Sequence, residues 1–356
     1  MVTTTVQVHL GAGIGNIVLA TPLLVALQEL GFSTDVVLAV ADYPETADLL
    51  HPWSAVRAIF TSPKPFPSPQ YYSWVIPAIP PFYWSGYARK FATTRNVVPR
   101  PSDALFYQDE QQYYLNFARL LGSVPERSPS CTLPIAPSNP PRTSQQTLIL
   151  APGCKTGEMA AKRWPYYSEL ADTFEDVAVV GTADDLWQYN GEQMQFSPHV
   201  KMFVNQLTLR QTAELLAGAG AVVANDTGLA YVAAAVGTPT LILFGPTPDK
   251  TLGNLPPNVR ILRGGLACEP CWFQARFCAC GGRIDCLTHI SVDDVVRSLG
   301  DLDFSGNVRE AVVGIRSQES EFRSRKIREP SKLIGAEESK NIACHSKVSF
   351  RIRPDS

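Results

Sequence analysis

The sequence lacks an excess of charge of either sign, a long apolar run and a recognisable amino-terminal leader. Its 356 residues include 31 Lys and Arg against 33 Asp and Glu, so we expect no nucleic-acid partner. No run of 18 or more apolar residues occurs, which argues against a membrane-spanning helix. No basic region precedes the first apolar stretch, so no signal peptide is predicted. We therefore expect a cytoplasmic protein that can lie at the periphery of the inner membrane.

Apolar residues make up 45% of the chain, enough to fill the cores of two ordinary domains. Strand–helix patterns begin twice, and their strands are apolar on both faces, which is typical of parallel sheets. The sequence predicts an α/β protein with two Rossmann-like, doubly wound domains, residues 1–143 and 144–300. Ligands are expected in a crevice at the carboxyl ends of the strands. Residues 301–356 are polar and predicted to form a partly disordered tail.

Residues 61–101 are rich in Pro, Tyr and Trp and show no clear periodicity. They are predicted to be irregular. A loop of this length inside a compact domain is usually functional or mobile.

The most distinctive stretch is residues 225–247, where a small polar cluster opens an Ala-rich helix that leads into an apolar strand. Thr227 is predicted to cap the helix with its side chain. The N–H groups of the first turn then favour a phosphate. Asp226 can accept hydrogen bonds from two neighbouring sugar hydroxyls; the alternative is a carboxylate that only stabilises the helix start.

A glycine loop follows the first strand, with Gly11, Gly13 and Gly15 spaced as G-x-G-x-G. This spacing is not the dinucleotide-binding fingerprint, and no acidic residue ends the second strand to hold a ribose. Asp42 is near, but it lies beyond the strand in a turn that contains proline. Taken alone, the loop can also be a tight strand–helix turn.

A third segment places Gly153 after an apolar strand and two cations, Lys162 and Arg163, before the Trp-Pro that opens the next helix. Cations are unfavourable at the start of a helix unless an anion lies between. We therefore expect Lys162 to meet an anionic ligand, with Arg163 and Lys155 as further candidates.

Together, these segments resemble glycosyltransferase family 9, the ADP-heptose:lipopolysaccharide heptosyltransferases, over residues 6–30 and about 147–299. The resemblance implies a GT-B fold, with two Rossmann-like domains facing across a cleft, the acceptor on the first and the sugar nucleotide on the second. It implies inverting transfer of heptose or a related sugar from an ADP-heptose-like donor to a hydroxyl of lipopolysaccharide or another cell-surface glycan. No cofactor is obligatory for such catalysis.

The resemblance also implies roles for individual residues. Lys162 and the groups at the helix start are expected to stabilise the diphosphate leaving group. Asp185, or its neighbour Asp184, lies where the family often places an acid near the ribose. The expected donor-binding residues are Gly13, Gly15, Gly153, Lys162, Asp185, Thr227 and Gly228. Tyr231 stands where heptosyltransferases tend to have His, which leaves the donor sugar open.

The chain departs from the family at Asn16, where the family carries the Asp expected to be the general base. An amide cannot accept the proton of the acceptor hydroxyl. Asn16 and Asp226 are the catalytic candidates, with Asn16 orienting the hydroxyl and the base supplied by His9, Asp226 or a carboxylate near Asp103 and Asp109. The alternatives are a catalytically impaired nucleotide-sugar-binding or assembly protein and a sugar-nucleotide epimerase of GT-B fold.

Five of the eight cysteines fall between positions 268 and 286. Their short spacings are compatible with a tetrahedral thiolate site. The resemblance adds that many family members carry a similar segment and that a related branch folds it around iron. A structural iron or zinc is therefore predicted at Cys268, Cys271, Cys278 and Cys286. The alternative is a set of reduced, buried thiols, since five cysteines exceed four ligands.

Overall fold

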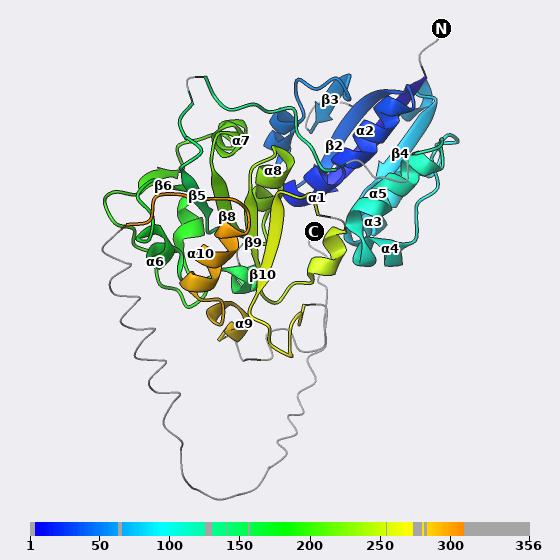
Figure 1. Ribbon diagram of the computed structural model, residues 1–356. Helices are drawn as coiled ribbons and strands as arrows, with labels where there is room; N and C mark the ends of the chain where they lie inside the picture. Colours follow the sequence, from blue (N-terminus) through cyan, green and yellow to red (C-terminus); the bar gives the residue numbers. More distant parts are fainter. Residues whose placement is uncertain are drawn as a thin grey trace, which may run out of the picture. The chain divides into compact units, whose positions relative to one another are not determined.

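The computed structural model describes residues 4–62, 66–124, 130–139, 141–155, 157–253, 255–272, 280 and 283–309. Within these residues the chain forms two parallel β-sheets with helices packed on them (Figure 1). Parallel sheets are buried on both faces, which explains why the strands have continuous apolar runs.

The first sheet has the strand order β3-β2-β1-β4. Its strands are β1 (Thr5–Ala12), β2 (Ser33–Ala41), β3 (Ala58–Thr61) and β4 (Trp74–Ala78). The helices of this half are α1 (Ile14–Leu19), α2 (Thr21–Glu29), α3 (Pro81–Tyr87), α4 (Asp103–Gln108) and α5 (Glu110–Arg119). Helix α2 buries Leu23, Leu24 and Leu27, residues at helical spacing that lie on one face. The pattern of these leucines therefore fixes which side of α2 meets the core.

The prediction that residues 61–101 are irregular is wrong. Strand β4 pairs in parallel with β1, and α3 follows it. Val75 and Ile76 are fully buried, so their apolar side chains supply the reason for the strand. Pro77 is tolerated because β4 is an edge strand. The proline-rich composition concealed this strand.

The second sheet has the order β10-β9-β8-β5-β6-β7. Its strands are β5 (Leu148–Ala151), β6 (Val177–Gly181), β7 (Lys201–Val204), β8 (Ala221–Asn225), β9 (Thr240–Phe244) and β10 (Val259–Arg263). The helices are α6 (Tyr167–Ala171), α7 (Leu209–Ala217), α8 (Gly228–Ala235), α9 (Asp285–Thr288) and α10 (Val292–Gly300). The chain order reverses between β5 and β8, the point at which doubly wound sheets bind ligands.

Short 3-10 helices connect several of these elements. They span Pro44–Leu49, Pro69–Tyr71, Ala88–Phe91, Gly157–Lys162, Ala183–Leu186 and Asp249–Leu252. The fourth of them carries Lys162 to the carboxyl edge of the second sheet.

The two halves meet where α1 packs against α8, and their apolar side chains belong to one continuous buried cluster. Two glycines make this approach possible. A Cβ on Gly15 would lie 2.7 Å from Cδ2 of Tyr231, and a Cβ on Gly228 would lie 2.8 Å from Cβ of Ile14. Larger residues at either position would push the two helix starts apart.

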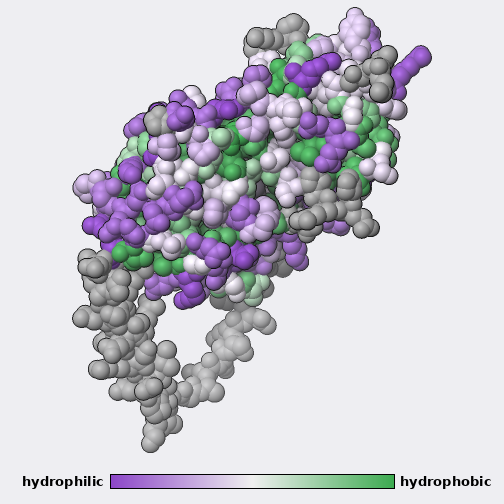
Figure 2. Space-filling model, turned by 45° about the horizontal axis from the view of Figure 1, so that its top comes forward, coloured by the Kyte–Doolittle hydropathy of each residue, from purple (hydrophilic) through white to green (hydrophobic). Residues whose placement is uncertain are grey.

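Residues 301–309 pack on the second half, with Leu302 and Phe304 buried and Val308 bridged to Phe174. The predicted tail therefore starts later than residue 301, and its remainder lies outside the described residues. No helix in the described part of the chain is both long and apolar enough to cross a membrane. On the face drawn in Figure 2, hydrophobic residues occur in small groups among hydrophilic ones, as is usual for a protein surface.

Candidate active site

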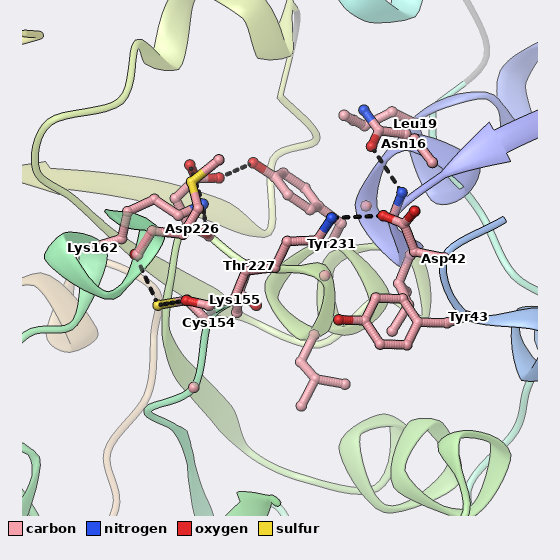
Figure 3. Close-up of a pocket in the computed structure, with 18 of the residues that line it drawn as sticks. Asn16, Leu19, Asp42, Tyr43, Cys154, Lys155, Lys162, Asp226, Thr227 and Tyr231 are labelled. Atoms are coloured by element: carbon pink, nitrogen blue, oxygen red, sulfur yellow. Dashed lines mark hydrogen bonds and ion pairs between the residues drawn. The ribbon is translucent and has the colours of Figure 1, made fainter. Parts of the chain in front are cut away.

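A pocket of about 570 Å³ lies between the two halves, at the carboxyl ends of the strands. Its walls include the two catalytic candidates, Asn16 and Asp226, and the seven expected donor-binding residues: Gly13, Gly15, Gly153, Lys162, Asp185, Thr227 and Gly228. Figure 3 shows Lys162 and Asp226 on one side and Asn16 and Asp42 on the other. The structure thus brings these residues together, while their roles remain predictions.

Asp226 and Lys162 form an ion pair on the wall built by the second half. Nζ of Lys162 lies 3.1 Å from Oδ2 of Asp226, and both side chains are nearly buried, at 13% and 14% exposure. The Tyr231 hydroxyl donates a hydrogen bond to Oδ1 of the same carboxylate. Burial raises the pKa of Asp226, but the Lys162 charge and the Tyr231 hydrogen bond outweigh it, so the pKa lies below its ordinary value. Asp226 is therefore a fixed negative charge near neutral pH.

Helix α8 begins beside this pair. Thr227 occupies the position before the first helical residue and has an extended backbone, but its side chain makes no capping hydrogen bond. The predicted side-chain cap is therefore wrong. Thr227, Gly228 and Leu229 all line the pocket. The first N–H groups of a helix have no partner inside the helix, so this end of α8 can bind an anion.

Asp185 lies against the loop after β5. A Cβ on Gly153 would fall 2.2 Å from Cγ of Asp185, so only glycine allows this contact. Asp185 accepts a hydrogen bond from the Thr182 N–H at 2.8 Å. Its neighbour Asp184 is not among the described residues that line the pocket. Asp185 is therefore the better placed of the two acids for a ribose.

The two cations named beside Lys162 have different surroundings. Arg163 is buried and donates hydrogen bonds to the carbonyl oxygens of Cys154, Asp184 and Trp187, so it braces loops. Lys155 lines the pocket, and its Nζ lies 2.6 Å from Oδ2 of Asp42 in the first half. This ion pair spans the pocket from one wall to the other (Figure 3).

Asn16 is held in one orientation on the opposite wall. Its Oδ1 accepts from the Gly13 N–H at 3.2 Å, and its Nδ2 donates to Oε1 of Glu110 at 2.7 Å. Glu110 is the first residue of α5, is 6% exposed and lines the pocket. The Tyr114 hydroxyl donates to the same Oε1 at 3.0 Å. Burial raises the pKa of Glu110 to about 7, although the bonds from Asn16 and Tyr114 oppose the shift.

The sequence suggested a carboxylate near Asp103 and Asp109 as the base but did not single out Glu110. An acid in the first turn of a helix is common because it stabilises the helix start, so the residue carries no distinctive signal. Glu110 reaches the pocket because α5 packs against α1. Glu110 and Asn16, which this packing brings together, are 94 residues apart in the sequence.

A family comparison identifies the segment that contains most of this pocket. Residues 105–277 match the family model described as glycosyltransferase family 9 (heptosyltransferase). The matched segment belongs to glycosyltransferase family 9. Lipopolysaccharide heptosyltransferase 2 of Escherichia coli is 31% identical over 135 residues, 34% of this chain and 37% of the relative. Lipooligosaccharide heptosyltransferase 2 of Haemophilus influenzae is 34% identical over 124 residues, 32% and 35% of the two chains. The chain thus spans little more than a third of the length of these curated relatives.

Solved structures of similar proteins show the same fold over more of the chain. E. coli ADP-heptose lps heptosyltransferase II has a TM-score of 0.61 at 19% identity and covers 84% of this chain and 98% of its own. E. coli heptosyltransferase WaaC with ADP-2-deoxy-2-fluoro heptose has a TM-score of 0.57 at 16% identity, covering 84% and 99%. The iron-containing dodecameric glycosyltransferase TibC from enterotoxigenic E. coli has a TM-score of 0.60 at 16% identity, covering 85% and 76%. The fold is therefore GT-B, as the sequence implied.

Three of the groups that the sequence suggested as alternative bases are poorly placed. His9 is buried and bonded through its ring to Tyr87 at 2.8 Å, and burial and Lys90 lower its pKa to about 3. Asp109 caps α5 by accepting from a backbone N–H, and Asp103 lies on the surface beside Arg100. None of these three groups is among the described residues that line the pocket.

Part of the pocket lining is an aromatic wall. It is formed by Tyr43, Phe82, Phe106, Tyr107 and Trp272, the first four of them from the first half. Phe82 is 55% exposed and stacks edge-on against Phe106. Flat apolar rings of this kind suit the faces of sugar rings.

The predicted metal site is only partly within the described residues. Cys268 is exposed, Cys271 and Cys286 are buried, and Cys278 lies outside the described residues. Burial raises the pKa of the Cys286 thiol to about 12. No group of three or more His, Cys, Asp or Glu side chains in the described part could hold a metal ion. Because Cys278 lies outside that part, the metal site remains a prediction, which elemental analysis of the purified chain can test.

Proposed function

We propose that this chain is an inverting glycosyltransferase that moves a sugar from a nucleoside-diphosphate donor to a hydroxyl of a glycan acceptor. The observation that carries the proposal is one pocket in which an anion-binding helix start and a buried Lys–Asp pair face a carboxylate and an aromatic wall. Heptose and a lipopolysaccharide acceptor are the proposed chemistry because the similar proteins are named for them.

The donor would lie on the wall built by the second half. Its diphosphate needs positive charge as the bond to the anomeric carbon breaks, and Lys162 with the N–H groups at the start of α8 can supply it. The Asp226 carboxylate keeps Lys162 at this position. Asp185 would accept hydrogen bonds from the ribose hydroxyls. Each group therefore has one task in holding the leaving group.

The acceptor would lie against the first half. Its hydroxyl oxygen attacks the anomeric carbon from the face opposite the diphosphate, which inverts that carbon and releases the nucleoside diphosphate. The aromatic wall would hold the sugar that bears the hydroxyl. The Asn16 amide has one N–H bonded to Glu110, and its second N–H can orient the hydroxyl.

A second candidate function is nucleotide-sugar binding without turnover. One observation favours it, namely the amide of Asn16 at the place where the family carries its general base. The two functions share the donor site and differ only in whether a proton acceptor serves the acceptor hydroxyl.

Thermal unfolding with ADP, ADP-heptose and UDP-sugars tests the donor site, and ADP release with heptose-free lipopolysaccharide tests turnover. A ligand at one hundred times its Kd should stabilise the folded chain by about 2.7 kcal/mol. We expect ADP-heptose to stabilise the chain and to be consumed when acceptor is present. Stabilisation without ADP release would support the binding protein, and no stabilisation by any sugar nucleotide would contradict both.

A further inference from the structure

Glu110 is a buried carboxylate that forms no ion pair with any described residue. Of the described Lys, Arg and His side chains, none lies within ion-pair distance of it. Burial of an uncompensated carboxylate is costly, and proteins concentrate such groups at functional sites. Glu110 also lines the pocket and contacts the position where the family carries its base.

We propose that Glu110 is the general base of the transfer reaction and that the amide of Asn16 positions its carboxylate. This inference rests on the proposed glycosyltransferase function. It means that the base is supplied by α5 rather than by the glycine loop.

The hydrogen bonds around Glu110 leave one oxygen for substrate. Asn16 and Tyr114 both donate to Oε1. Among the described residues, Oε2 accepts no hydrogen bond. A general base must be within hydrogen-bond reach of the proton that it removes. An acceptor hydroxyl in the pocket can donate to Oε2 while Oε1 stays fixed.

The same geometry explains why an amide at position 16 suits this chain. An Asp there would place a second carboxylate 2.7 Å from Oε1 of Glu110. Two carboxylates at that distance cannot both be ionised near neutral pH. The amide instead donates a hydrogen bond that stabilises the ionised form of Glu110. The amide at position 16 and the carboxylate at position 110 are therefore compatible. In this chain the carboxylate lies on α5 instead of at position 16.

The proposed step balances in atoms and charge. The acceptor O–H proton passes to Oε2 of Glu110 as its oxygen bonds to the anomeric carbon. The bond from that carbon to the diphosphate oxygen breaks, and its electron pair leaves with the nucleoside diphosphate beside Lys162. Glu110 then returns its proton to solvent.

Charged and titratable groups around Glu110 contribute to a pKa near neutral pH. Asp226 and the neighbouring Asp109 carry charges that raise its pKa, in addition to burial. Tyr113, Tyr231 and Cys131 also lie within electrostatic range and are neutral near pH 7. With a pKa of about 7, the carboxylate is ionised in slightly alkaline solution and still basic enough to accept a proton.

The first experiment compares Glu110→Gln with the full-length wild-type chain, using ADP-heptose and heptose-free lipopolysaccharide. We expect kcat to fall roughly 10²- to 10⁴-fold, the contribution typical of a general base, with donor KM changed by less than about threefold. The wild-type kcat should rise with pH through about 7, and this rise should be absent in the variant. Asp103→Asn, which removes an exposed carboxylate outside the pocket, should leave both unchanged.

The second experiment tests whether a carboxylate at position 16, in the glycine loop, can replace the one at position 110 as the base. Asn16→Asp combined with Glu110→Gln should recover at least about tenfold of the kcat lost in Glu110→Gln. A Glu110→Gln chain with wild-type kcat and pH profile would overturn the proposal. So would a double variant no faster than Glu110→Gln, because the role of Glu110 would then be structural. A wild-type chain that releases no ADP would instead refute the glycosyltransferase function itself.

Discussion

The two walls of the pocket each carry a nearly buried carboxylate, and their environments differ. Asp226 on the second half is paired with Lys162 and Tyr231, and these partners hold its pKa below the ordinary value despite burial. Glu110 on the first half accepts hydrogen bonds from two neutral groups, Asn16 and Tyr114, and burial raises its pKa to about 7. One carboxylate therefore has a fixed charge, while the other can change its protonation near neutral pH.

This difference separates two tasks that a glycosyltransferase must perform. The diphosphate side needs a constant arrangement of charge, which a locked ion pair provides. The acceptor side needs a group that takes up a proton, and titration near the working pH provides it. Carboxylates whose pKa values are pushed apart by their environments usually have different chemical roles.

The largest expected effect is on stability as a function of pH. The pKa of Glu110 is raised from 4.5 to about 7, so the folded state holds this proton more tightly than the unfolded state. This tighter proton binding adds roughly 3 kcal/mol to the free energy of unfolding below about pH 4.5. The contribution is lost as pH rises through about 7. Glu110→Gln removes the ionisation, so its stability relative to wild type should increase between pH 5 and pH 8. Denaturant unfolding at both pH values measures this, and parallel curves for the two chains would contradict it.

The next effect concerns the charge on the other wall. Lys162→Ala removes the cation beside Asp226, and ADP affinity should fall tenfold or more, because charge-assisted hydrogen bonds contribute about 1.5–3 kcal/mol. Calorimetric titration with ADP measures the change. Lys201→Ala is the matched control, since Lys201 forms a 2.8 Å ion pair with Asp176 outside the pocket. An unchanged Kd for ADP would remove Lys162 from the donor site.

Asn16→Asp tests whether the side chain at position 16 must be uncharged. A second carboxylate beside Glu110 should raise the pKa of one of the two, and kcat at pH 7 should fall about tenfold, with a smaller loss at pH 9. Asn190→Asp is the control, because Asn190 makes a similar 3.0 Å amide–carboxylate bond to Glu192 on the exposed surface. A large gain in kcat from Asn16→Asp would show that the natural chain is simply disarmed at its base.

The second half, whose wall carries the Asp226–Lys162 pair, was easier to predict from the sequence than the first half. Strands β6, β8 and β9 are each a short apolar run bounded by turn residues, which is the local pattern that predicts a buried strand. The polar cluster that precedes α8 is also a local feature. Local signals did not show that Asp226 is locked by Lys162, a contact between residues 64 positions apart.

The first half was less predictable for the same physical reason. Strand β4 contains Pro77, and its burial depends on pairing with β1 across more than sixty residues. Glu110 meets Asn16 only because α5 packs near α1. Propensity and periodicity describe neighbours in sequence, whereas these contacts are created by tertiary packing.

The smallest expected effect concerns the ion pair that joins the walls. Lys155 and Asp42 lie 2.6 Å apart, but Lys155 is 51% exposed, and such pairs contribute at most about 1 kcal/mol. Lys155→Ala should therefore change the KM for ADP-heptose by less than about fivefold. In a double-mutant cycle with Asp42→Asn, the coupling should stay below about 1 kcal/mol and fade at 1 M salt. Tyr83 also donates to Asp42, at 2.6 Å, so Tyr83→Phe serves as a second partner in the cycle. A salt-resistant coupling above about 2 kcal/mol would contradict this expectation. It would mean that the Lys155–Asp42 ion pair is needed to position the two walls of the pocket relative to each other.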